Sequence, residues 1–104
     1  MNNKKKLVGE GPFAGLWVRI ARALEAGGYT SRKKISADVK TYKLRPYISV
    51  RDYGRIAHIE VVTWLVIHGD MKRSEALRRF TASFGKPAMP YIRARMKEQA
   101  QRAK

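Results

Sequence analysis

Residues 56–71 contain no Lys or Arg, although the chain has 23 such residues elsewhere. We expect this run to form the centre of the fold. The run is rich in Ile and Val, so a strand is possible. However, about 17 residues separate Val50 from His68, which is normal for a helix and long for a strand. Apolar side chains would surround such a helix, as is typical of a buried one. We therefore predict a buried central helix over 50–68, started by a Ser49-x-x-Asp52 capping pattern.

The charge is concentrated on both sides of this run. The formal net charge is +15, from 23 basic and 8 acidic residues. Residues 32–55 and 72–104 carry most of the excess, whereas Glu60 is the acid inside the central helix and is expected to face solvent or a basic partner. Such an excess of positive charge on a small protein destabilises the compact state through mutual repulsion. A polyanionic partner is the simplest explanation for the excess.

An amphipathic helix is expected before the central one. Apolar residues from Phe13 to Leu24 recur at spacings of three and four, which predicts a helix over 12–26. Pro12 suits the first helical turn, because its missing N–H would have no partner there. Gly27 is expected to end the helix.

The segments on either side of that helix are less regular. Residues 31–42 fit a short helix after a Thr30 or Ser31 cap, followed by an extended turn through Pro46, although a period of two also fits part of this segment. Residues 1–10 have no apolar period and begin with a lysine run, so we expect a disordered basic arm there.

Two more helices are expected after the central one. Asp70 can cap a helix whose apolar stripe runs from Ala76 to Phe84, and Gly85 would end it. A turn over 86–89 would then lead to a last helix, whose inward stripe is Met89, Ile92, Met96, Ala100 and Ala103.

A helix, a short turn containing Gly and a second helix form the layout of a helix-turn-helix unit, here over 70–103. The residues Phe80-Thr81-Ala82-Ser83-Phe84-Gly85 and Lys86-Pro87-Ala88-Met89-Pro90-Tyr91-Ile92-Arg93 resemble helix-turn-helix DNA-binding proteins, in particular small plasmid and phage repressors. Phe84 and Gly85 match that pattern. Thr81 stands where Ala is usual, and Tyr91 stands where Val or Ile is usual. The resemblance covers about a third of the chain and implies that the last helix reads DNA.

Physical reasoning supports the same surface. A helix with a basic start can enter a major groove ~12 Å wide, where Arg pairs with guanine edges and apolar groups meet thymine methyls. The candidates for reading bases are Lys86, Met89, Tyr91, Arg93 and Lys97. The candidates for phosphate contacts are Lys72, Arg73, Arg78, Arg79, Arg95, Arg32, Lys33 and Lys34. The alternative is that 70–103 is simply the last helical hairpin of a basic bundle.

Other chemistry has little support. Cysteine is absent, which removes disulfides, thiolate zinc sites and thiol nucleophiles. His58 and His68 lack the further ligands that a zinc site needs, and no serine has a placed His and Asp. We therefore expect no metal, no cofactor and no enzymatic activity. The chain has no apolar run of ~18 residues and no secretory signal pattern, so no membrane segment and a cytoplasmic location are expected.

We therefore predict an all-α protein, a four- to five-helix bundle with a buried central helix and a C-terminal helix-turn-helix. Residues 11–104 would form one DNA-binding domain. The expected function is sequence-specific binding of double-stranded DNA by a small transcriptional regulator of phage or plasmid type, acting as a homodimer over two half-sites. Two alternatives share the charge. One is a small basic protein that binds and inhibits a protein partner, and the other is an RNA-binding protein, although no RNP-like strand or GXXG loop is visible.

Overall fold

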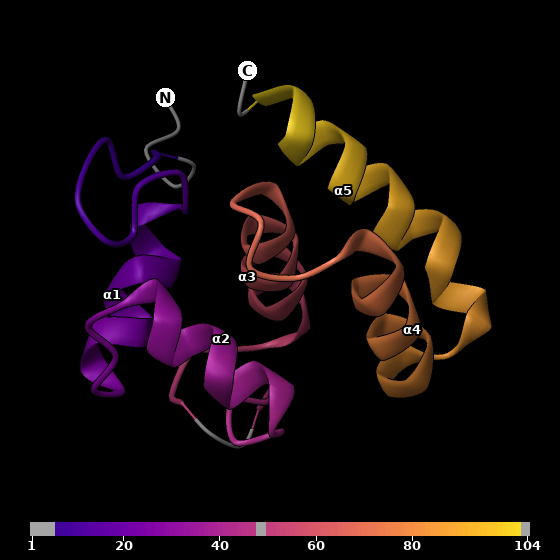
Figure 1. Cartoon of the computed structure of the whole chain (residues 1–104), viewed down its shortest axis with the longest axis horizontal. Coiled ribbons are helices and arrows are strands. Elements are labelled where there is room, and N and C mark those ends of the chain that lie inside the picture. The colour runs from indigo at the N-terminus through magenta and orange to yellow at the C-terminus, as the bar shows by residue number, and fades with distance from the viewer. Residues whose placement is uncertain (1–5, 48–49, 103–104) are drawn as a thin grey trace. The chain divides into compact units, whose positions relative to one another are not determined.

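Helices form nearly all the regular structure of the computed structural model, which describes residues 6–47 and 50–102 (Figure 1). Over these residues there are five α-helices and one short 3-10 helix, η2, and the β-structure there is a single isolated bridge between Leu7 and Trp17. The all-α prediction is confirmed. The chain divides into two compact units, residues 1–58 and 59–104, and each is described by itself. One domain over 11–104 stays a prediction.

The first unit begins with a short paired segment. The Val8 amide donates to the Leu16 carbonyl at 2.8 Å, and the Val18 amide donates to the Lys6 carbonyl at 2.8 Å. The expected disordered arm over 1–10 is therefore wrong for residues 6–8, which the backbone of 16–18 holds in place. The first five residues of that expected arm lie outside the described residues.

The first helix, α1 (Val18–Ala26), begins six residues later than the predicted 12–26. Gly15 has a φ of 94°, a left-handed conformation that a helix cannot pass through, and Trp17 is extended with a ψ of 141°. The periodicity was nevertheless informative, because Phe13, Leu16 and Trp17 are buried although they precede the helix. At the other end the Tyr29 amide donates to the Leu24 carbonyl at 3.0 Å, which closes the last turn.

The second helix, α2 (Arg32–Lys40), starts one residue after the predicted position 31 and ends two residues before position 42. The Ser31 hydroxyl accepts a hydrogen bond from the Lys34 amide at 3.2 Å, which confirms Ser31 as the cap. Inside the unit the Tyr29 hydroxyl donates to Asp38 Oδ2 at 2.7 Å. That bond, opposed by burial and helped by Lys34, holds the pKa of Asp38 below its usual value. Burial and the same partner raise the pKa of Tyr29.

The apolar run forms α3 (Arg55–Ile67), and the boundary between the two units falls within it. Its side chains from position 58 to position 65 are buried, as predicted for the central helix. The helix starts five residues after position 50, because Asp52 has a φ of 64° and interrupts any helix there. Ser49 of the expected capping pattern lies outside the described residues.

The second unit continues with α4 (Arg73–Phe84), η2 (Lys86–Ala88) and α5 (Met89–Arg102). Lys72, and not Asp70, is the residue before the first turn of α4. The Asp70 amide instead donates to the Leu65 carbonyl at 2.8 Å, which places it in the turn after α3. The predicted turn over 86–89 is mostly a 3-10 turn that leads directly into α5.

Candidate nucleic-acid interface

The helix, turn and helix expected over 70–103 lie within the second unit, where α4 and α5 are neighbours joined by η2 (Figure 1). Gly85 ends α4 with a φ of 85°, a conformation that favours glycine, and its amide donates to the Thr81 carbonyl at 2.9 Å. Pro87 follows in η2, and the Ala88 amide donates to the Gly85 carbonyl at 3.3 Å. This short connection fixes the point at which α5 begins.

One side of α5 is exposed and carries the predicted base-reading side chains. Tyr91 is 50 % exposed, and Arg93 and Lys97 are exposed on the same helix. Lys86 is exposed in η2, directly before α5. Ala94, a small residue, is also exposed beside Arg93. Four of the five predicted base-reading residues are therefore accessible.

Met89 is the exception, and its prediction as a base reader is wrong. It is only 6 % exposed, because it begins the apolar stripe that α5 turns inward with Ile92 and Met96. The last part of that stripe also differs from the prediction. Gln99 is buried in place of Ala100, which is exposed, and Ala103 lies outside the described residues.

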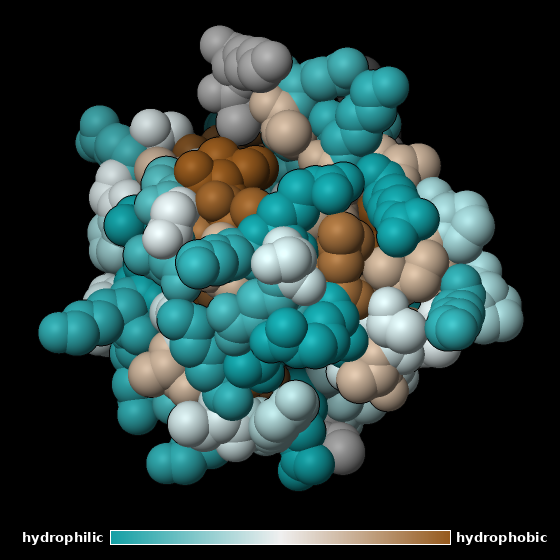
Figure 2. Space-filling view, turned by 45° about the vertical axis from the view of Figure 1, so that its right-hand side comes forward, coloured by the Kyte–Doolittle hydropathy of each residue, from teal (hydrophilic) through white to brown (hydrophobic). Residues whose placement is uncertain are grey.

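The phosphate candidates on α4 separate into two kinds. Lys72, Arg73 and Arg78 are exposed. Arg79 instead pairs with Glu75 one turn earlier, with Arg79 Nη2 2.9 Å from Glu75 Oε2, and its side chain is 19 % exposed. Figure 2, turned so that the side of Figure 1 with α4 and α5 comes forward, shows many hydrophilic side chains with hydrophobic patches between them. Three of these four cations are therefore accessible to solvent.

A buried carboxylate explains the position of Arg95. Glu60 of α3 is 1 % exposed, and its Oε1 lies 3.8 Å from Arg95 Nη2. The Arg95 guanidinium also donates to the Tyr91 hydroxyl at 3.3 Å and lies over the Tyr91 ring, 5.6 Å from its centroid. The expectation that Glu60 meets a basic partner is confirmed. Arg95 is therefore held by Glu60 and Tyr91, which argues against its predicted role as a free phosphate contact.

Two residues that complete this cluster were missed in the sequence. Arg102 Nη2 donates to Glu60 Oε2 at 3.0 Å, and the Gln99 side-chain amide donates to the Glu60 carbonyl at 3.1 Å. Together with Arg95 they tie the second half of α5 to α3. The signal in the sequence was Glu60 itself, because a carboxylate inside an apolar helix has to find cations.

The remaining phosphate candidates lie in the first unit, at the start of α2. Lys33 and Lys34 are exposed, and Arg32 is half-buried. Lys34 Nζ lies 3.4 Å from Asp38 Oδ1, so part of its charge is balanced within the helix. No acid stands in the first turn of α2, and three cations there oppose the positive end of the helix dipole. These cations are unfavourable for the helix and form a basic cluster of the first unit.

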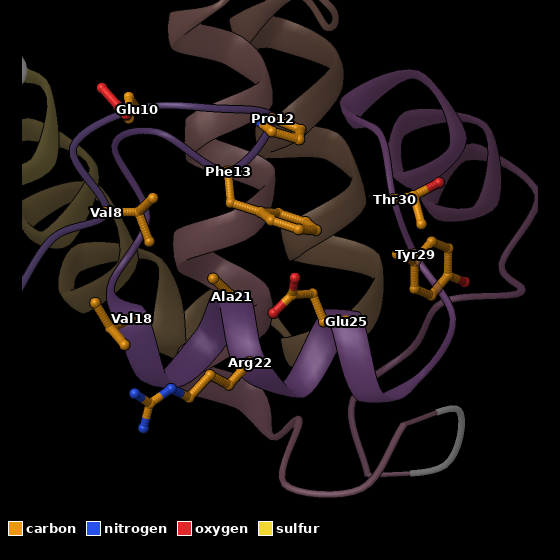
Figure 3. Close-up of a pocket in the computed structure, with 10 residues that line it drawn as sticks. All are labelled: Val8, Glu10, Pro12, Phe13, Val18, Ala21, Arg22, Glu25, Tyr29 and Thr30. Atoms are coloured by element: carbon orange, nitrogen blue, oxygen red, sulfur yellow. The ribbon is translucent and has the colours of Figure 1, made fainter.

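Two hollows adjoin α1 in the first unit. A cavity of about 440 Å³ lies between α1 and the preceding segment. Phe13 lies in its middle, Glu25 turns toward Phe13, and Arg22 extends away (Figure 3). Glu10 and Glu25 line the cavity against one arginine, a balance that does not suit a polyanion.

The other hollow has the opposite charge and was not predicted. It measures about 870 Å³, and its charged lining residues are Arg19, Arg22, Arg51 and Asp52. Arg19 and Arg22 stand one turn apart on α1, and Arg51 and Asp52 come from the loop before α3. Three guanidinium groups around one hollow suit phosphate oxygens.

Comparisons with known proteins add no relative: the chain matches no protein family, no curated protein and no solved structure. Among the described residues, no group of three or more His, Asp or Glu is placed to hold a metal ion. None of the helices formed by residues 6–47 and 50–102 is long and apolar enough to cross a membrane.

Proposed function

We propose that this protein binds double-stranded DNA in a sequence-specific manner, as a small transcriptional regulator. The observation that carries the proposal is the exposed side of α5, where Arg93, Lys97 and Tyr91 stand beside the small Ala94, with the opposite side buried. Small residues let a helix approach the floor of a groove, and long basic residues then reach the base edges.

The dimensions support this placement. An α-helix with its side chains is about 10–12 Å across, and the major groove is ~12 Å wide. The exposed Arg93 can form two hydrogen bonds with a guanine edge, and Tyr91 can contact a thymine methyl. The cluster of Glu60 with Arg95 and Arg102 serves this role indirectly, because it fixes how α5 presents its exposed side.

The exposed cations of α4 would contact the phosphates on either side of the groove. Each phosphate neutralised on a duplex contributes about −0.9 to the slope of log affinity against log salt. Arg73→Gln and Arg78→Gln should each make that slope shallower by about one unit and leave the sequence preference intact. A homodimer over two half-sites is the expected assembly, because one such helix reads few base pairs.

The deciding experiment selects bound sequences from a random duplex pool and then titrates variants against the selected site and its single-base mutants. Arg93→Ala should remove discrimination at one base pair, worth about 1–3 kcal/mol. Arg73→Ala is the matched control, and it should weaken binding to all sequences evenly. An even loss with Arg93→Ala would show that Arg93 contacts phosphate. If the wild type does not distinguish any duplex from random DNA, the proposal fails in favour of an RNA or protein partner.

A further inference from the structure

The loop between α2 and α3 contains an unusual concentration of backbone strain. Tyr42, Tyr47 and Asp52 have φ values of 62°, 69° and 64°, and they are the non-glycine residues with positive φ among the described residues. Asp adopts this conformation with some ease, but a bulky residue such as Tyr rarely does. Such strain persists where surrounding structure enforces it, and it concentrates at functional sites.

The described residues of this loop, 41–47 and 50–54, are called the tyrosine loop below. Buried side chains anchor it at Leu44, Val50 and Tyr53. The Leu44 amide donates to the Asp38 carbonyl at 3.0 Å, and the Tyr47 amide donates to the Tyr53 carbonyl at 2.7 Å. The loop is therefore a built structure, and the placement of its exposed side chains follows from these anchors.

The two strained tyrosines point their rings into solvent. Tyr42 is 55 % exposed and Tyr47 is 74 % exposed, the highest value of any large apolar residue described. A methyl group placed on Gly54 would lie 3.1 Å from Cε1 of Tyr47 and 3.6 Å from its Cζ, so the ring rests against the Gly54 backbone. Tyr47 is thus a supported aromatic surface that remains largely open to solvent.

The loop that carries this ring is rich in cations. Its exposed basic residues are Lys43, Arg45 and Arg51, against the exposed acid Asp52, and the exposed Arg55 follows as the first residue of α3. Arg51 and Asp52 also line the 870 Å³ hollow with Arg19 and Arg22 of α1. The Tyr47 amide donates a hydrogen bond to the carbonyl of Tyr53, the residue that follows Asp52. This bond brings the backbone of Tyr47 close to the residues that line the hollow.

We propose that this surface of the first unit binds single-stranded nucleic acid. An unpaired base stacks on the open side of Tyr47, and the neighbouring phosphates lie beside Arg19, Arg22 and Arg51. A duplex hides the faces of its bases, whereas a single strand presents them to aromatic side chains. This activity is separate from groove reading by α5, since it uses rings and guanidinium groups of the other unit.

The strain supplies a variant that removes the ring without harming the fold. Asn tolerates a positive φ better than Tyr, so Tyr47→Asn should leave the melting temperature unchanged or raise it. Stacking of one base on an aromatic ring is worth roughly a tenfold change in affinity or more by substitution. Tyr47→Asn should therefore weaken binding of a short fluorescent oligo(dT) about tenfold, whereas Tyr47→Phe should bind like the wild type.

Two further variants define the surface. Arg51→Gln should make the salt slope for oligo(dT) shallower by about 0.7, the value for one phosphate of a single strand. Tyr42→Asn is the matched control, since it removes another exposed tyrosine with a positive φ from the same loop, and it should leave oligo(dT) affinity unchanged.

Two outcomes would overturn the proposal. One is oligo(dT) affinity that Tyr47→Asn leaves at the wild-type value, and the other is an equal loss with Tyr47→Asn and Tyr42→Asn. Parallel titrations with oligo(U) and oligo(dU) identify the sugar, and tight binding of any of these oligonucleotides through Tyr47 supports the proposal. A failure of the proposed duplex recognition would be detected separately, by whether Arg93→Ala changes the discrimination between a selected duplex and its single-base mutants.

Discussion

Replacing Arg102 with Ala tests how α5 is held. Glu60 is 1 % exposed and lies 3.0 Å from Arg102 but 3.8 Å from Arg95. Removal of Arg102 leaves a carboxylate without access to water and with only its more distant cation. Breaking a buried ion pair from one side costs about 3–5 kcal/mol. Because Arg102 is itself 25 % exposed and Arg95 remains, we expect a loss of about 2–3 kcal/mol in the free energy of unfolding.

Removing the charge of Glu60 should lower the free energy of unfolding by less than removing Arg102 does. Glu60→Gln keeps the volume and one oxygen acceptor, and it removes the charge that is hardest to bury. The two arginine side chains are 20 % and 25 % exposed, so both can turn toward water when the carboxylate is gone. We expect Glu60→Gln to cost about 1 kcal/mol, less than Arg102→Ala. This order of costs is the signature of a carboxylate buried more deeply than its partners.

The assay is urea unfolding followed by circular dichroism, with a thermal melt beside it. For a chain of this size, a loss of 2–3 kcal/mol corresponds to a fall of about 10–20 °C in melting temperature. Arg93→Ala is the matched control, because it removes an exposed arginine from the same helix and should stay within about 0.5 kcal/mol of the wild type. A loss below that value for Arg102→Ala, or a larger loss for Glu60→Gln, would refute the reasoning.

Three further predictions concern buried side chains. Trp64→Ala should cost about 3–5 kcal/mol in urea unfolding, because Trp64 is 2 % exposed, and an unchanged transition would show that the ring is not packed. Burial lowers the pKa of His58 to about 4, below about 6.5 in the unfolded chain, so the unfolded state takes up this proton first. Stability is then full above about pH 6.5 and falls by about 3 kcal/mol toward pH 4, and His58→Gln should flatten the pH profile over that range. Tyr29→Phe removes the 2.7 Å hydrogen bond to Asp38 and should cost about 1–3 kcal/mol at neutral pH, with a smaller cost once the carboxyl is protonated.

The sequence predicts burial well because helical periodicity is local. The stripe of Met89, Ile92 and Met96 and the burial of Trp64 depend on spacings within one helix, and the structure has both. Helix starts were predicted less well. The late start of α3 follows from the left-handed backbone at Asp52, which the loop enforces through bonds such as that between Tyr47 and Tyr53. The spacing of residues within one helix does not predict such a contact in a loop.

The candidate site shows the same limit. Arg79 and Arg78 look equivalent as cations, although Glu75 four residues before Arg79 signals the pair that restrains it. Arg102 gives no such signal, because its partner Glu60 is 42 residues away in the sequence. Which arginines hold the fold and which remain exposed is therefore decided by packing between helices, and the sequence alone assigns them to one basic surface.

The structure thus separates the basic residues that stabilise the fold from those that remain exposed, a distinction that the net charge alone does not make. Within the described residues, Glu60, Glu75 and Asp38 are paired with cations inside their own units, so those cations serve the fold. The exposed cations that remain differ in their surroundings. On α5 they stand beside a small residue on a regular helix, which suits the edges of paired bases. On the tyrosine loop they share the loop with an open aromatic ring, which suits the faces of unpaired bases. Since a duplex offers edges and a single strand offers faces, the same excess of charge is expected to serve two forms of nucleic acid through two units.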